Sequence, residues 1–139
     1  MVADSMTGQT NDDPRRLRGL LDRARDLARE HAVPSVVLGL AAREGDLSFP
    51  EFVAFLQSAL RVEDAIFRMT RERAVIHLAD LDCAKAQEVF ERLLGDFSDE
   101  FPSMTAPAFD VRYYEVKPGL SELRVRDVLT QLFAPETLH

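Results

Sequence analysis

The chain has very little cysteine and histidine, the residues that build disulfides and most transition-metal sites. Cys83 is the single cysteine among 139 residues, and the three histidines are His31, His77 and His139. One cysteine excludes an internal disulfide, and histidines this far apart match no metal-binding spacing. We therefore expect no metal, no cofactor and no disulfide, and the single cysteine fits a reducing, cytoplasmic compartment.

Long apolar runs and a surplus of positive charge are missing as well. No segment approaches the roughly 18 consecutive apolar residues that a membrane span requires, and the N-terminus has no apolar signal core. The net charge is -7, so the summed electrostatic field repels a phosphate backbone at long range. These absences predict no membrane insertion and no nucleic-acid binding.

The composition is that of one ordinary domain behind a polar arm. The hydrophobic content is 46%, which is enough to bury a single core at this length. Residues 1–12 are polar and show no apolar period. We therefore expect a flexible N-terminal arm followed by one domain over residues 13–139.

A leading helix is predicted over residues 14–31. Asp13 supplies an N-cap and Pro14 fits the first helical position, while Pro34 disfavours helical backbone at the residue before it. An apolar face recurs at helical spacing and comprises Leu17, Leu20, Leu21, Ala24, Leu27 and Ala28. Two interpretations stay open: the helix packs on its own domain, or it pairs with a second chain in a homodimer.

The first strand is predicted at Ser35–Ala42, where a nearly continuous apolar run is typical of a strand covered on both faces. Ser48 and Glu51 form a capping box for the helix that follows. The apolar face of that helix comprises Phe52, Val53, Phe55, Leu56 and Leu60. We therefore expect this strand at the centre of a sheet, with the helix packed on it.

Two further strands, at Asp64–Met69 and Ala74–Ala79, are joined by a short polar hairpin at Thr70–Arg73. His77 alternates within the second of them and is interpreted as a packed histidine of the core or its rim. The remaining predicted elements are a helix capped by Asp82 that carries Val89, Phe90, Leu93, Leu94 and Phe97, a strand at Phe109–Val116 and a final helix at Glu122–Phe133. The order after the leading helix is βαββαβ, which predicts an α+β, ferredoxin-like antiparallel sheet with both inner helices on one face.

Residues 52–79 resemble the centre of the GGDEF (diguanylate cyclase) domain, and the order of elements matches that family over residues 33–116. In the family a helix ends in Arg-x-x-Asp, three residues and an arginine follow, and one further residue precedes the Gly-Gly-Asp/Glu-Glu-Phe hairpin. This chain has Arg61, Asp64 and Arg68 at that spacing. The resemblance implies a nucleotidyl-cyclase-like fold for the domain.

The catalytic pattern of the family is replaced in this chain. Residues 70–74 are Thr-Arg-Glu-Arg-Ala, and residues 40–43, where the family has a metal-binding aspartate, are Leu-Ala-Ala-Arg. Phosphodiester formation on a nucleoside triphosphate needs carboxylates that hold divalent cations. It also needs a turn that the triphosphate can approach closely, which glycines permit because they lack a Cβ. We therefore expect no catalytic residues, no metal site and no enzyme activity.

Arg61 and Asp64 keep the spacing of the family's inhibitory site, which binds cyclic di-GMP in active members. The resemblance therefore implies a cyclic di-GMP receptor. Arginine suits bidentate contact with a phosphate or a guanine edge, and aspartate can accept hydrogen bonds from guanine N1 and N2. The alternative is purely structural: Asp64 ends the helix and starts the strand, and Arg61 stabilises the helix C-terminus.

The rival hypothesis is a protein-interaction module. In this interpretation the exposed hairpin, formed by Thr70, Arg71, Glu72 and Arg73, is a recognition surface, and the domain receives its input from a protein partner. We predict a catalytically inactive GGDEF-like regulatory module of bacterial signalling that acts through protein–protein interaction. Cyclic di-GMP reception is the alternative, and a ferredoxin-like interaction domain with chance similarity to the cyclase hairpin is a third.

Overall fold

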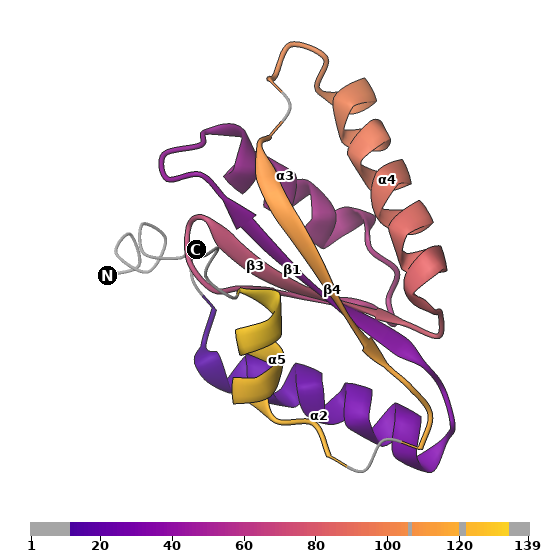
Figure 1. Ribbon diagram of the computed structural model, residues 1–139. Helices are drawn as coiled ribbons and strands as arrows, with labels where there is room; N and C mark the ends of the chain where they lie inside the picture. Colours follow the sequence, from indigo (N-terminus) through magenta and orange to yellow (C-terminus); the bar gives the residue numbers. More distant parts are fainter. Residues whose placement is uncertain (1–11, 106, 120–121, 134–139) are drawn as a thin grey trace, which may run out of the picture.

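The computed structural model describes residues 12–105, 107–119 and 122–133, and its strands form one antiparallel sheet (Figure 1). The strands are β1 at Ser35–Ala42, β2 at Ala65–Arg68, β3 at Arg73–Ala79 and β4 at Phe109–Val116. Their order across the sheet is β2-β3-β1-β4. β1 is central, because Ser35 pairs with Ala79 of β3 on one side and with Val116 of β4 on the other. The predicted α+β class and βαββαβ order are confirmed.

Helices cover both faces of this sheet (Figure 1). They are α2 at Pro14–Glu30, α3 at Ser48–Ala59, α4 at Cys83–Glu100 and α5 at Val125–Leu132. The inner helices α3 and α4 share one side, here called the α3/α4 face, and α2 and α5 cover the other, the α2/α5 face. The leading helix predicted over residues 14–31 is therefore α2, packed on its own sheet. No helix in the described ranges is both long and apolar enough to cross a bilayer.

An aromatic core fills the α3/α4 face. Leu38 of β1 and Ile76 of β3 point into it and are buried. Phe52 of α3 lies among these side chains, with its ring centroid 5.3 Å from that of Phe97 and 5.9 Å from that of Phe90 on α4. Both pairs are edge-to-face, a geometry that adds to the stabilisation from buried area. This face is the larger of the two core clusters.

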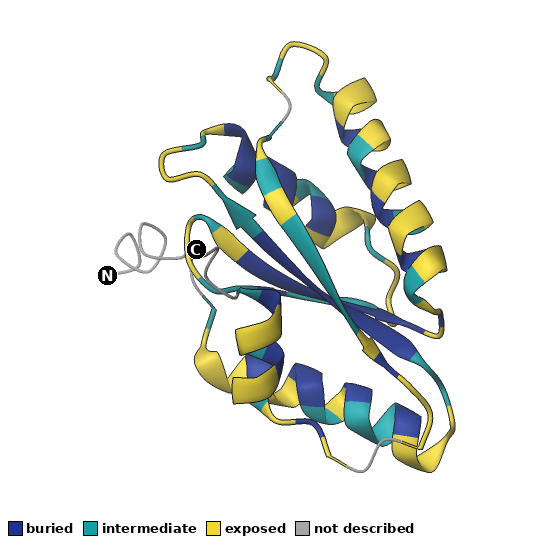
Figure 2. Cartoon of the chain, viewed as in Figure 1, coloured by how far each residue is buried: buried dark blue, intermediate teal, exposed yellow. Residues whose placement is uncertain are grey.

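Mainly aliphatic and small side chains fill the α2/α5 face, with Phe67 as its buried aromatic residue. Val37 of β1 and Val75 of β3 point toward this side, since successive residues of a strand alternate between faces. They meet Leu21 and Ala24 on the buried stripe of α2 (Figure 2). Residues 35–40 of β1 are consequently all buried, as expected for a strand covered on both faces.

The start of α3 differs from the predicted capping box of Ser48 and Glu51, because no side chain of that box caps the helix. Asp46 Oδ1 instead accepts hydrogen bonds from the backbone N–H groups of Ser48 at 2.8 Å and Phe49 at 3.1 Å. Its Oδ2 accepts from the N–H of Ala108 at 3.0 Å. The bond from Ala108 and those from the helix start lower the pKa of Asp46 against the opposing effect of burial. Asp46 therefore satisfies the donors that the box was expected to satisfy.

Two element boundaries also differ from the prediction. β2 is shorter than residues 64–69, because the hairpin closes at Met69, whose N–H donates to the carbonyl of Arg73 at 3.0 Å. α5 begins at Val125 instead of Glu122, since Arg124 has an extended backbone with φ -98° and ψ 137°. Both changes leave the order of elements intact.

Asp12 anchors the start of the described chain to the open edge of β2; the other residues of the expected arm lie outside the described ranges. Its carboxylate accepts hydrogen bonds from the backbone N–H and Nη2 of Arg68, both at 2.8 Å, and its own N–H donates to the Arg68 carbonyl at 2.8 Å. Burial acts to raise the pKa of Asp12, but the hydrogen bonds and charge of Arg68 outweigh it and lower that pKa. These contacts pair backbone groups that an edge strand would otherwise expose.

Candidate functional site

Arg61 and Asp64 meet in the turn that leads from α3 to β2. Arg61 Nε donates to Asp64 Oδ2 and Arg61 Nη2 donates to Asp64 Oδ1, both at 2.9 Å, so the pair is bidentate. Arg61 Nη2 also donates to the carbonyl of Ala79 at 2.7 Å, and the N–H of Ala79 donates to Asp64 Oδ1 at 3.0 Å. The pair therefore fastens this turn to the end of β3.

Asp64 is fully engaged by these internal contacts, whereas Arg61 faces solvent. The Asp64 side chain is 2% exposed, and a fourth hydrogen bond reaches it from the N–H of Arg61 at 3.3 Å. A carboxylate offers about four acceptor positions, so the protein itself fills them. The Arg61 side chain is 45% exposed, and its Nη1 lies 3.3 Å from a carboxylate oxygen of Glu63. The hydrogen bonds to Asp64 raise the pKa of Arg61.

A pocket of about 210 Å³ opens beside Arg61. α4 contributes Lys85 and Arg92 to its lining. Lys85 makes an exposed contact with Glu88 at 3.6 Å, and Arg92 has no ion-pair partner within the described ranges. Three cationic side chains thus border one pocket, whose lining also includes the acidic residues Asp64 and Asp80. Sequence reasoning missed Lys85 and Arg92, because only the packing of α4 beside the end of α3 brings them to Arg61.

The hairpin Thr70–Arg73 is exposed at its tip and fixed at its base. Thr70, Arg71 and Arg73 are exposed, and Glu72 is half-buried. Thr70 Oγ1 accepts a hydrogen bond from the N–H of Glu72 at 3.2 Å. The Arg73 guanidinium lies 5.1 Å from the centroid of the Phe133 ring, within the range of a cation–π contact. The side chains of Thr70 and Arg71 also border a pocket of about 200 Å³ next to α3.

The hairpin lies beside the end of β1, but the side chains there do not fit a catalytic metal. The carbonyl of Glu72 accepts a hydrogen bond from the N–H of Ala42 at 2.7 Å, so the two segments are neighbours. Arg43 follows β1, and Thr70 and Arg71 occupy the turn. Among the described residues, no three acidic, histidine or cysteine side chains gather as metal ligands. Mg²⁺ and Ca²⁺ require several oxygen ligands, which these residues do not supply.

His77 lies in β3 with its side chain fully buried, as the sequence pattern predicted for a core histidine. Neither ring nitrogen has a hydrogen-bond partner among the residues that the structure describes. Desolvation lowers the pKa of His77 to about 4; the charge of Asp64 acts in the opposite direction, and that of Arg23 adds to the lowering. The imidazole is therefore neutral at pH 7.

Comparison with known proteins is informative at the level of structure only. No protein-family model matches the sequence, and no curated protein is significantly similar to it. The GGDEF domain of FimX from Pseudomonas aeruginosa superimposes with a TM-score of 0.65 at 13% identity, covering 88% of each chain. A structure of PelD from Pseudomonas aeruginosa PAO1 gives a TM-score of 0.66 at 19% identity, but the match covers 85% of this chain and 44% of that one.

A ligand-bound structure is also similar. The GGDEF domain of DgcB from Caulobacter crescentus, solved in complex with c-di-GMP, gives a TM-score of 0.59 at 14% identity over 81% of each chain. Identities this low establish the fold alone. The fold that the spacing of Arg61, Asp64 and Arg68 predicted is thereby confirmed: this chain has the architecture of a GGDEF domain.

Proposed function

We propose that the chain is a non-catalytic, GGDEF-like regulatory module that binds cyclic di-GMP at the pocket beside Arg61. The observation that carries the proposal is the convergence of Arg61, Lys85 and Arg92 on one pocket. Each is a cation at the edge of a concave site, and such groups bind phosphate oxygens through charge-assisted hydrogen bonds. A dinucleotide with two phosphates and two guanine edges offers acceptors to all three.

The internal contacts assign different roles to the two predicted site residues. Asp64 holds the Arg61 guanidinium in a fixed orientation, so less conformational entropy is lost when a ligand binds to it. A direct hydrogen bond from a guanine to Asp64 requires exchange of one of the four internal bonds. In this proposal Arg61 is the contact residue and Asp64 is the positioning residue.

The fold supports the same ligand class. The DgcB domain, which has this architecture, was solved with c-di-GMP, and the turn between α3 and β2 carries the Arg-x-x-Asp spacing of the family's inhibitory site in this chain. The absence of catalysis rests on the hairpin and on the end of β1. Thr70 and Arg71 place side chains where a triphosphate has to approach, and the neighbouring residues offer no set of metal ligands.

Calorimetric titration tests the proposal, with cyclic di-GMP as the ligand and GTP with Mg²⁺ as the comparison. We expect saturable binding of cyclic di-GMP and a loss of about two- to five-fold in affinity for Arg92→Gln, since Arg92 is exposed and a solvent-screened ion pair contributes about 0.2–1 kcal/mol. Arg92 has no structural partner in the described ranges, so this variant avoids the unfolding that Arg61→Ala risks. Arg43→Gln is the matched control, an exposed arginine outside the pocket.

Two outcomes would contradict the binding part of the proposal. Absence of a binding heat with cyclic di-GMP at millimolar ligand, at two temperatures that differ by about 15 °C, would contradict reception, because the heat-capacity change of binding prevents a zero enthalpy at both. Equal affinity of Arg92→Gln and wild type for cyclic di-GMP would show that the ligand binds outside this pocket. Product formation from GTP and Mg²⁺ would overturn the non-catalytic part separately.

The second candidate is a protein partner at the hairpin. The observation that favours it is the exposure of Thr70 and Arg71 next to a pocket lined on its other side by Pro50, Val53, Ala54 and Gln57 of α3. A largely aliphatic surface bordered by two arginines, Arg68 and Arg71, has a composition typical of protein interfaces. A partner retained by wild type and by Arg43→Glu, but lost with Arg71→Glu, would support this function. Sedimentation equilibrium tests whether that partner is a second copy of the chain.

A further inference from the structure

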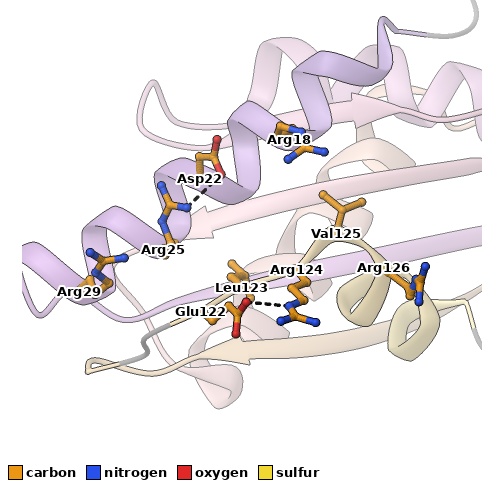
Figure 3. A pocket seen from close by; sticks show the side chains of 9 residues that line it. All are labelled: Arg18, Asp22, Arg25, Arg29, Glu122, Leu123, Arg124, Val125 and Arg126. Atoms are coloured by element: carbon orange, nitrogen blue, oxygen red, sulfur yellow. Dashed lines mark hydrogen bonds and ion pairs between the residues drawn. The ribbon is translucent and has the colours of Figure 1, made fainter.

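A groove of about 620 Å³ lies between α2 and the segment Glu122–Arg126, and its two walls carry a concentration of arginine (Figure 3). α2 contributes Arg18, Arg25 and Arg29, and the facing segment contributes Arg124 and Arg126. The acidic residues of the lining are Asp22 and Glu122. Five cations and two anions leave this groove strongly positive in a chain whose net charge is -7.

The acidic residues of the groove neutralise only part of this charge. Arg25 lies 3.5 Å from Asp22 and 3.1 Å from Asp26, and Arg124 lies 2.7 Å from Glu122. Figure 3 shows the Asp22 and Glu122 pairs on opposite walls. The other three arginines, Arg18, Arg29 and Arg126, have no ion-pair partner in the described ranges. Arg25 and Arg29 are also four residues apart on one helix, a spacing at which like charges repel.

Two further features of the groove, its apolar floor and the start of α5 at one end, favour binding of an anionic chain. In the facing segment, the buried Leu123 and the half-buried Val125 pack on the α2/α5 core, and Glu122, Arg124 and Arg126 beside them are exposed. α5 begins in the same segment; the side chain of its N-cap residue, Arg124, makes no capping hydrogen bond, and Asp127 is the acidic residue of its first turn. The N-terminal end of a helix attracts negative charge through its unpaired donors and its dipole.

We propose that this arginine groove binds an extended acidic segment of a partner protein. The three groove arginines of α2, here called the α2 row, span a length that matches such a segment. Arg18, Arg25 and Arg29 lie on one side of the helix, and the eleven-residue separation of the outer two corresponds to about 16 Å. An extended chain covers that length with about five residues, whose alternate side chains on one face are spaced by about 7 Å. Two or three carboxylates of one segment can therefore meet the row together.

The exposure of the arginines decides between this occupant and smaller or larger anions. Arg18, Arg29, Arg124 and Arg126 are all exposed, and a single exposed ion pair contributes little because water screens it. One phosphate group therefore gains too little, and several charges on one chain are required. A nucleic acid carries a charge on every nucleotide beyond the length of the groove, so the overall negative field of the protein repels it more strongly than a short acidic segment.

Fluorescence anisotropy tests the proposal with a labelled octapeptide of alternating glutamate and serine, at 50 mM salt. The matched probe has glutamine in place of each glutamate. The key variant is the double substitution Arg18→Gln with Arg29→Gln, which removes two unpaired cations and keeps helix propensity nearly unchanged. The control, Arg43→Gln with Arg15→Gln, makes the same change in net charge at exposed positions that do not line the groove.

We expect wild type to bind the glutamate peptide but not the glutamine peptide, and the double variant to bind about five- to thirty-fold more weakly. The control should change affinity by less than about two-fold, since long-range charge is screened. Equal weakening in both double variants, or no saturable binding by wild type, overturns the proposal. Tighter binding of tripolyphosphate or of a 20-nucleotide oligo-dT overturns it as well, because either result reassigns the groove to a phosphate ligand. Arg92→Gln should bind the peptide like wild type, which separates this surface from the cyclic di-GMP pocket.

Discussion

The two faces of the sheet are packed in different ways. Seven of the nine phenylalanines form a connected set of ring contacts on the α3/α4 face. They are Phe49, Phe52, Phe55, Phe90, Phe97, Phe101 and Phe109. The α2/α5 face is instead lined mainly by aliphatic and small residues, with Phe67 as its buried aromatic, and it also holds His77, which has no hydrogen-bond partner in the described part of the chain, and the close approach of α5 to Gly39.

The difference in packing indicates which face of the sheet contributes more to the free energy of folding and which contributes less. Aromatic rings in edge-to-face contact fix the relative positions of α3, α4 and the sheet. A buried imidazole with no hydrogen bond lowers stability on the opposite face, because burial of an unpaired polar group is unfavourable. We therefore expect the α2/α5 face to respond to pH and to small changes in packing, and the α3/α4 face to respond to loss of volume.

The largest effect is expected from Phe52→Ala, which opens the aromatic set at a ring that contacts four others. Loss of a buried phenylalanine costs about 3–5 kcal/mol in the free energy of unfolding. Urea unfolding followed by circular dichroism measures it. The control is Val62→Ala, a fully exposed position that should change stability by less than about 0.5 kcal/mol. A loss below about 1 kcal/mol for Phe52→Ala would show that this face does not depend on its aromatic packing.

Gly39→Ala tests the close approach on the α2/α5 face. A Cβ at Gly39 would lie 2.6 Å from Leu132 Cβ and 3.2 Å from Phe133 Cζ, so α5 has to move outward. We expect a loss of about 1–3 kcal/mol, the usual cost of overpacking. Gly95→Ala is the matched control on α4, where a Cβ has no neighbour within 4 Å; there alanine should stabilise the helix by about 0.5–1 kcal/mol. A neutral Gly39→Ala would mean that α5 is not held closely against β1.

The pH dependence of unfolding tests the role of His77. Its pKa of about 4 in the folded state lies below the unfolded value of about 6.5. The unfolded chain therefore binds more protons between these values, and stability falls as pH decreases from about 6.5 to 4. Between pH 7 and pH 5 this group should account for a loss of about 2 kcal/mol. His77→Met should remove that part of the slope, and parallel pH profiles for the two proteins would contradict the expectation.

The smallest effects are expected from the helix caps, which also differ between the faces. Asp46 on the α3 side accepts three backbone hydrogen bonds, so Asp46→Ala should cost about 1–2 kcal/mol. Asp13 accepts one backbone hydrogen bond at the exposed start of α2, and Asp13→Ala should cost less. Thermal unfolding of the two variants under identical conditions compares them. The reverse order of stabilities would show that the contact of Asp46 with Ala108 contributes nothing.

Local patterns in the sequence were sufficient for most of the fold. The apolar run of Ser35–Ala42 indicated a strand covered on both faces, and the periodicity of residues 14–31 indicated α2. These predictions succeeded because helical and strand periods are set by local backbone geometry. The capping box at Ser48 failed because its motif competed with Asp46, and sequence spacing alone does not show which carboxylate reaches the first N–H groups.

Only some residues of the candidate sites could be predicted from the sequence. Arg61 and Asp64 could be chosen from their spacing, but their mutual bidentate contact and the four hydrogen bonds on Asp64 depend on the position of Ala79 at the end of β3. Lys85 and Arg92 gave no sequence signal, since one helical face of α4 has to pack beside α3 before they border the pocket. The arginine groove likewise joins residues from opposite ends of the described chain.

The sequence by itself determined the order of elements, the central position of β1 and the residues that stand in place of the cyclase hairpin pattern, because each depends on residue types within a short window. Tertiary structure decided which charges meet. It placed α2 and Glu122–Arg126 on the same side of the sheet, and it brought the cations of α4 to Arg61. The physical reason is that electrostatic contacts fall off over a few ångströms, so they are fixed by how helices pack and not by their separation along the chain.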